Sequence, residues 1–168
     1  MKNSKEIDIA QKLIRCKSIA PKDGGTLRIV EKECKAMGFK CTKLRFSEKG
    51  FDTINNWYAE IGNGKPHFSF AGHVDIVPAD KKEWKVDPFE GKIKNNFLIG
   101  RGACDMKSAI ACFLSAAKNY LGENKNFKGK ISIIITGDEE TYAVNGTKKI
   151  LTWLKKRKNR FLFSWRTN

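Results

Sequence analysis

Hydrophobic side chains recur every three or four positions over the first forty residues, a spacing typical of amphipathic helices. The first helix is expected near residues 5–16, with Ser4 as its N-cap. Its apolar stripe consists of Ile7, Ala10, Leu13 and Ile14. The second stripe consists of Leu27, Val30, Cys34 and Met37, with Gly38 as the expected stop. The pattern therefore predicts two helices before any strand.

Apolar and polar residues alternate after Gly38, and this change of period predicts strands. Strands are expected at Lys40–Phe46 and at Asn56–Ile61. A third, more apolar stretch is FSFAGHVDIVP at Phe68–Pro78, where the proline is expected to end the pairing. Because helices precede these strands and return later, the order indicates a layered α/β structure.

The second half of the chain repeats this mixture of elements. A short hairpin is expected around the Asn95–Asn96 turn, and a strong helix is expected to follow Met106. Ile131–Thr136 is β-branched and apolar on both faces, as in a central strand that is covered on both sides. A last helix is expected near Thr147–Leu154. The predicted fold class is α/β, with a mixed, mostly parallel sheet that is flanked by helices.

Length and charge limit the possible functions. A chain of 168 residues with 40% hydrophobic residues suits one domain with a real core. The net charge of +15 suggests nucleic-acid binding, but lysines are spread along the chain and no aromatic-interleaved basic stripe appears. We therefore expect a solvated lysine-rich surface without a nucleic-acid partner. Its positive field would favour the approach of a small anionic substrate.

Cysteine usage and the N-terminal segment bear on location. The segment MKNSKEIDIAQ is polar and then amphipathic, and no apolar stretch is long enough for a membrane span. We therefore expect a cytoplasmic protein without membrane contact. The five cysteines form no C-x-x-C pair and are expected to stay reduced as small buried residues.

Chemistry-bearing residues follow three separate apolar or glycine-rich stretches. His73 and Asp75 are two residues apart and should project to one side of a strand. Asp105 follows a GRG turn, and Asp138–Glu140 follows the run ISIIIT. Functional sites in open α/β sheets lie beyond such strand ends, so these groups are expected to converge.

Two divalent ions about 3.5–4 Å apart need a bridging carboxylate, further ligands and a base for water. His73, Asp105 and Glu140 have the residue types of metal ligands, and Glu139 has that of the base. Asp75 would orient the imidazole from behind. Each residue also has a simpler reading, since Asp105 could merely cap a helix and the glutamates could form a solvated turn. His67 is expected to have no role in the site.

Four motifs together resemble one known family. GHVDIVP, W-x-x-D-P-F at Trp84–Phe89, GRGACDMK and TGDEE are similar, in order and spacing, to motifs of the M20 family of di-zinc amidohydrolases and peptidases. The resemblance implies a zinc-peptidase-like catalytic domain with two Zn²⁺ ions, for which Co²⁺ or Mn²⁺ are possible substitutes.

The resemblance also implies individual roles. His73 would bind one zinc ion, Asp105 would bridge the pair, and Glu140 would bind the other. Glu139 would be the general acid and base, with Asp75 as the supporting carboxylate. A cis peptide bond between Asp105 and Met106 is implied as well.

The chain departs from the family pattern after residue 157. The resemblance implies that residues 1–157 correspond to the N-terminal part of the catalytic domain. It also implies that full-length members are homodimers with a lid or dimerisation domain, which we expect to be absent from this chain. The tail 158–168 is expected neither to continue a helix nor to form a strand. The tail can be written as a nucleotide sequence with A/T-rich codons. When one adenine is removed from that sequence, the shifted frame translates as K-I-D-F-Y-L-V-G-E-P, which resembles a missing family segment. The hypothesis is a frameshifted ending and a chain with little or no activity.

Three functional hypotheses follow. TYAVNGTKK at Thr141–Lys149 resembles the family branch that hydrolyses N-succinyl-LL-2,6-diaminopimelate to succinate and diaminopimelate, in lysine biosynthesis. The expected partner is therefore a small anionic N-acyl amino acid. An acetylornithine deacetylase or an M20 metallocarboxypeptidase is the alternative within the family. A non-catalytic basic protein that binds nucleic acid or another partner is the alternative of another class, and it leaves the ordered motifs unexplained.

Overall fold

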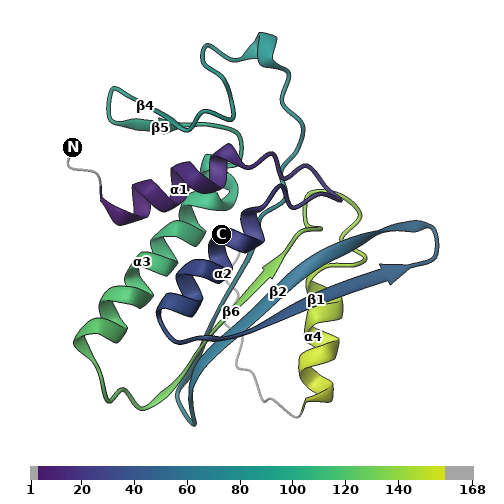
Figure 1. The fold of residues 1–168 in the computed structure, drawn as a ribbon. Helices are drawn as coiled ribbons and strands as arrows, with labels where there is room; N and C mark the ends of the chain where they lie inside the picture. The colour runs from purple at the N-terminus through teal and green to yellow at the C-terminus, as the bar shows by residue number, and fades with distance from the viewer. Residues whose placement is uncertain (1–3, 158–168) are drawn as a thin grey trace.

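A computed structural model describes residues 4–157 and contains a four-stranded sheet with helices on both faces (Figure 1). The helices are α1 (Lys5–Arg15), α2 (Thr26–Ala36), α3 (Ser108–Glu123) and α4 (Thr147–Lys156). The strands of the sheet are β1 (Lys40–Glu48), β2 (Phe51–Asn63), β3 (His67–His73) and β6 (Gly129–Thr136). A separate hairpin is formed by β4 (Lys92–Lys94) and β5 (Phe97–Ile99), and the single-turn helices are η1 (Lys81–Glu83) and η2 (Ala103–Lys107).

The sheet has the strand order β1-β2-β6-β3, so β1 and β3 lie at its two edges among the described residues. β1 pairs antiparallel with β2, β2 pairs antiparallel with β6, and only β3 and β6 are parallel. The mixed sheet flanked by helices is confirmed, but its predicted mostly parallel pairing is wrong for this part of the chain. For β1 and β2 the reason is the tight turn that joins them, since such a turn can only connect antiparallel strands, whereas β2 and β6 meet from distant parts of the chain.

The core is divided into two layers by the central strand β6. Ile133 and Ile135 pack with the apolar sides of α1, α2 and α3, whereas Ile134 packs with Ile150 and Leu154 of α4. Ile133, Ile134 and Ile135 are each fully buried, and Ile131 nearer the start of the strand is half-buried. This alternation explains why the run ISIIIT carries no polar face, and it confirms the prediction of a strand that is covered on both sides.

The predicted helices are all present, with ends that differ by a few residues. The third predicted strand differs more, because β3 ends at His73 rather than at Pro78. The N–H of Val74 still donates to the carbonyl of Thr136 at 2.9 Å, and the N–H of Ile76 then donates to Ser18 at 3.1 Å. The chain therefore leaves the sheet just where the predicted site residues begin.

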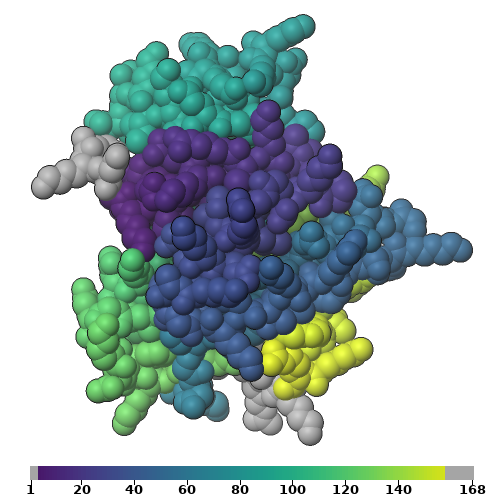
Figure 2. All heavy atoms as spheres, in the orientation of Figure 1, coloured from purple at the N-terminus to yellow at the C-terminus, as the bar shows by residue number. Residues whose placement is uncertain are grey.

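The segment between β3 and α3 lies on top of α1 (Figure 2). The side-chain amide of Gln11 donates to the carbonyl of Gly91 at 2.7 Å, and the Nε of Arg15 donates to Glu90 at 3.1 Å. The predicted β4–β5 hairpin is confirmed. Asn95 and Asn96 have φ values of 50° and 64°, the left-handed conformation that a tight two-residue hairpin turn requires.

The cysteine prediction is correct in part. All five cysteines are free, but Cys34 alone is buried, and Cys104 and Cys112 are exposed. No helix within residues 4–157 combines the length and apolar character needed to cross a bilayer. The predicted aberrant tail at 158–168 lies outside the described residues.

Candidate metal centre

Three loops meet at one end of the sheet. His73 is the last residue of β3 and is paired with Thr136, the last residue of the parallel strand β6. The loops that follow these two strands therefore start side by side, as expected at the carboxyl ends of parallel strands. The third loop is η2, which carries Asp105 just before α3.

The predicted ligands come together at this end. One ligand atom from each of His73, Asp105 and Glu140 lies within 4.8 Å of the other two, so a single cation could contact all three. The Nε2 of His73 is 2.9 Å from Asp105 Oδ1 and 3.8 Å from Glu139 Oε2. The His73 side chain is 5% exposed, whereas those of Asp105 and Glu139 are 73% and 56% exposed. The imidazole of His73 is therefore buried, whereas the carboxylates of Asp105 and Glu139 that lie near it face the solvent.

Asp75 connects two of the three loops. Its Oδ2 accepts hydrogen bonds from the backbone N–H groups of Glu139 and Glu140 at 2.9 and 2.8 Å. Its Oδ1 lies 3.5 Å from His73 Nδ1 and has no hydrogen-bond partner among residues 4–157. The carboxylate is 2% exposed. Asp75 therefore faces the back of the imidazole while it holds the backbone of both glutamates.

The carboxylates set the charge state of the site. Burial alone would lower the pKa of His73, but the carboxylates of Asp75 and Asp105 beside its two nitrogens raise that pKa to about 9. Burial alone would raise the pKa of Asp75. The imidazole of His73 and two backbone N–H donors have the larger combined effect, so the pKa of Asp75 is lowered. Burial and, less strongly, the nearby carboxylates raise the pKa of Glu140, although the His73 imidazole acts in the opposite direction. A proton on His73 therefore balances the acidic groups before any cation binds.

The raised pKa of His73 predicts a pH-dependent stability in the absence of added metal. The folded chain binds this proton more tightly than an unfolded chain with an ordinary pKa of 6.5, so the stabilisation is complete below pH 6.5 and is lost as pH rises through about 9. The free energy of unfolding should fall by up to about 3 kcal/mol over this window. Urea unfolding at a series of pH values would measure it.

The control for this measurement is His73→Gln, which removes the titrating ring. Burial lowers the pKa of Lys107 to about 8, which gives an opposite slope above that pH. This contribution is common to both proteins and cancels in their difference. A difference that stays constant between pH 6 and pH 9 would contradict the assignment.

The η2 turn is held against α1 by Lys107, two residues after Asp105. The peptide bond between Asp105 and Met106 is cis, as the resemblance implied. The Nζ of Lys107 is fully buried and donates to the carbonyls of Leu13 and Cys16 at 2.9 and 2.8 Å. These carbonyls lie at the C-terminal end of α1, where a cation is favoured. Sequence reasoning missed Lys107, because a lysine in a lysine-rich chain carries no signal of burial.

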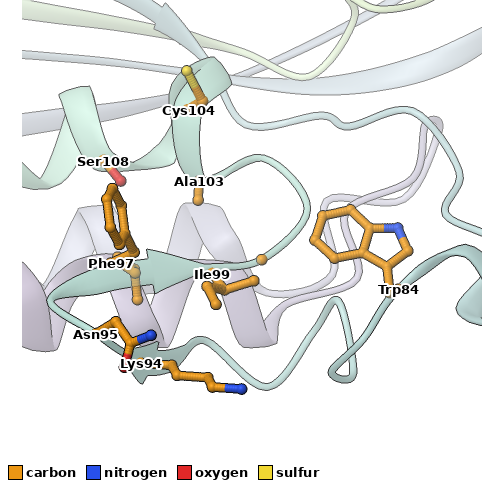
Figure 3. Close-up of a pocket in the computed structure, with 10 residues that line it drawn as sticks. Trp84, Lys94, Asn95, Phe97, Ile99, Ala103, Cys104 and Ser108 are labelled. Carbon is orange, nitrogen blue, oxygen red and sulfur yellow. The ribbon is translucent and has the colours of Figure 1, made fainter.

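An open cavity of about 740 Å³ lies against the same turn (Figure 3). Ala103 and Cys104 of η2 line it together with Trp84 and Phe97. Figure 3 also shows Lys94, Asn95 and Ile99 of the β4–β5 hairpin and Ser108 of α3 in the lining. Sequence reasoning did not anticipate this cavity, since it forms only when the hairpin folds over the η2 turn.

A mixed α/β domain with an imidazole and two carboxylates gathered at its strand ends has the architecture of a metal-binding hydrolase domain. The family model that describes peptidase family M20/M25/M40 at the sequence level matches residues 69–165, which is more than half of the chain. The chain belongs to this family.

Curated relatives refine this assignment. The chain is 48% identical over 159 residues to succinyl-diaminopimelate desuccinylase of Pelagibacter ubique, a match that covers 94% of the chain and 41% of the relative. It is 50% identical over 152 residues to the protein of the same name from Parvibaculum lavamentivorans, which covers 90% of the chain and 38% of the relative. The chain therefore spans about two fifths of the length of these relatives.

Solved structures show the same fold. Human carnosine dipeptidase 1 superposes with a TM-score of 0.80 at 20% identity, over 90% of this chain and 35% of the dipeptidase. An M20 family metallo-carboxypeptidase from Sulfolobus solfataricus superposes with a TM-score of 0.74 at 27% identity, over 92% of this chain and 34% of the carboxypeptidase. The mixed sheet and its helices thus form part of a recurring fold.

Proposed function

We propose that the chain provides the metal-binding part of an amide hydrolase that cleaves N-succinyl-LL-2,6-diaminopimelate to succinate and diaminopimelate. The observation that carries the proposal is the meeting of His73, Asp105 and Glu140 within 4.8 Å at the strand ends. The names of the two bacterial relatives support the substrate. The substrate would be a small anionic N-acyl amino acid, whose approach the net charge of +15 favours.

The donor set fits a divalent metal ion. One imidazole nitrogen and carboxylate oxygens are ligands that Zn²⁺, Co²⁺ and Mn²⁺ all accept, and Zn²⁺ is the proposed ion because the resemblance implies it. His73 would bind through Nε2, because its Nδ1 faces Asp75. Asp105 and Glu140 would supply the carboxylate ligands. When bound, the ion would polarise the amide carbonyl and lower the pKa of a water molecule to about 7.

The remaining chemistry falls to Glu139. Its carboxylate is 56% exposed and lies 3.8 Å from His73 Nε2, so it is at the site and accessible to solvent. Glu139 would accept a proton from the attacking water and donate it to the nitrogen of the leaving amine. Asp75 would keep the imidazole oriented and the backbone of Glu139 fixed while this proton moves.

A chimera would test the function and the substrate together. The chain joined to the remaining three fifths of the Pelagibacter ubique relative should hydrolyse N-succinyl-diaminopimelate, and Glu139→Gln in that chimera should lower kcat by about 100-fold or more, the loss expected for a missing general base. The 168-residue chain alone should bind metal but show little or no hydrolysis.

The same assay separates the alternatives. Each protein would be tested on N-succinyl-diaminopimelate, N-acetylornithine and a dipeptide, with succinate, acetate or amino-acid release as the readout. Preferred hydrolysis of acetylornithine or of the dipeptide would overturn the substrate, and activity that survives Glu139→Gln would overturn the assigned base. Rapid hydrolysis by the chain alone would overturn the expected dependence on the remaining part.

A further inference from the structure

The loop between β6 and α4, residues 137–146, carries both Glu139 and Glu140. The motif N-G-T at residues 145–147 ends this loop and begins α4, yet it contributes nothing to the metal group itself. The side chain of Glu139 is 56% exposed. An exposed carboxylate of this kind is located by its backbone, so the contacts that fix the loop decide where it can reach.

Asn56 of β2 joins the two ends of this loop. Its Nδ2 donates to the carbonyl of Asn145 at 2.9 Å and to that of Ile54 at 3.3 Å. Its Oδ1 accepts from Thr136 Oγ1 at 2.8 Å and from the N–H of Gly137 at 3.4 Å. The side chain is 1% exposed and uses both donors and both acceptor positions. A single buried amide therefore links the first and the last part of the loop.

Asp138 closes the loop from inside. Its Oδ1 accepts from Thr141 Oγ1 at 2.5 Å and from the N–H of Ala143 at 3.1 Å, and its Oδ2 accepts from the N–H of Asn145 at 2.7 Å. The residue is 4% exposed. Both oxygens of the Asp138 carboxylate therefore accept hydrogen bonds from backbone and hydroxyl donors within the loop, so Asp138 is not a candidate metal ligand.

The N-G-T residues complete the same network. The Nδ2 of Asn145 donates to the carbonyl of Asp52 on β2 at 2.8 Å. A Cβ atom on Gly146 would lie 2.5 Å from Thr136 Oγ1 and 2.7 Å from the carbonyl oxygen of Asp138, so no larger residue fits. The motif therefore lets the end of the loop pack directly on its own beginning.

We propose that Asn56 and Asn145 are positioning residues, which act with Asp138 to hold Glu139 and Glu140 at the metal centre. This inference rests on the proposed function, because it assigns these residues an effect on the same site. The loop is held from one side by Asp75 and from the other by this network, so Glu140 has a fixed approach to His73 and Asp105. Without the network, Glu140 would still be present but would no longer be held within reach of His73 and Asp105.

Cobalt binding by the 168-residue chain tests the proposal, because Co²⁺ reports both affinity and ligand geometry through its visible absorption. Asn56→Ala and Asn145→Ala should each weaken Co²⁺ binding by about tenfold and change the absorption band. Tyr58→Phe is the matched control, since it removes a partly buried 2.7 Å hydrogen bond to Glu60 on the same strand and leaves the contacts of the loop unchanged. The control should bind Co²⁺ as the unchanged chain does.

A second set of variants distinguishes positioning from a general loss of stability. In a Glu140→Gln background the ligand is already lost, so adding Asn145→Ala should have no further effect on Co²⁺ affinity. Equal weakening in both backgrounds, or equal weakening by Tyr58→Phe, would overturn the proposal. Unchanged Co²⁺ binding by both asparagine variants would overturn the positioning role alone. No Co²⁺ binding by the unchanged chain would overturn the proposed metal centre and this inference together.

Discussion

Asp105→Asn is expected to weaken metal binding by about 100-fold. Structural zinc sites with four protein ligands bind with about 10–16 kcal/mol, which is about 3 kcal/mol for each ligand and corresponds to roughly 100-fold in affinity. Asp105 also lies 2.9 Å from His73 Nε2 and is the carboxylate nearest to that nitrogen within the described residues. Asparagine keeps the shape of the side chain but removes its charge, so the loss measures the contribution of the carboxylate.

Isothermal titration with Zn²⁺ or Co²⁺ would measure this effect. The matched control is Asp8→Asn on α1, which makes the same change of charge at an exposed aspartate that is paired with Lys12 at 2.5 Å. That variant should bind the ion like the unchanged chain. If both substitutions weaken binding equally, the effect comes from net charge and Asp105 is not a ligand.

Asp75→Ala is expected to lower the free energy of unfolding by about 3 kcal/mol in the absence of metal. The substitution leaves the N–H groups of Glu139 and Glu140 without their acceptor, and each unsatisfied buried donor costs about 1–3 kcal/mol. It also removes the carboxylate that faces His73 Nδ1. Metal affinity should fall in addition by about 10–100-fold, as for other residues that orient a ligand.

Asp75→Asn separates these two effects. Its side-chain oxygen can still accept from both N–H groups, so above about pH 9, where the proton on His73 is already lost, the stability should stay within about 1 kcal/mol of the unchanged chain. The imidazole keeps its 3.1 Å contact between Nδ1 and the backbone carbonyl of residue 75 but loses the negative charge beside it, so the metal affinity should still fall. Urea unfolding and Co²⁺ titration of both variants would measure the two quantities. Equal stability of Asp75→Ala and the unchanged chain would show that the hydrogen bonds from Asp75 to the backbone of Glu139 and Glu140 do not stabilise the fold.

Local patterns were sufficient for most of the fold. The helical spacing in the first forty residues and the apolar run ISIIIT each depend on neighbours in sequence, and the structure confirms the elements that they predict. The direction of strand pairing depends instead on how distant segments meet. The antiparallel pairing of β2 with β6 was therefore not recognised.

The residues of the site also fall into those that local sequence patterns predict and those that only the folded structure identifies. The motif residues His73, Asp105 and Glu140 were predicted from their types and their places at strand ends, and the structure brings them together. Lys107 and Asn56 were missed because their importance comes from burial and from partners up to 94 residues away. A polar residue within a strand or beside a motif has no sequence signal that separates a buried hydrogen-bonding role from a solvated one.

The two edges of the sheet differ in a way that affects how the protein can be handled. β1 carries Lys40, Lys43 and Arg45, whose charges discourage another strand from pairing there. β3 has no lysine, arginine or proline, and its Phe68 is 61% exposed. Within residues 4–157 no strand pairs with the outer edge of β3, and open backbone groups beside an apolar side chain favour intermolecular strand addition. Concentrated samples are therefore expected to aggregate through β3, and a lysine at position 68 is the substitution that should improve solubility.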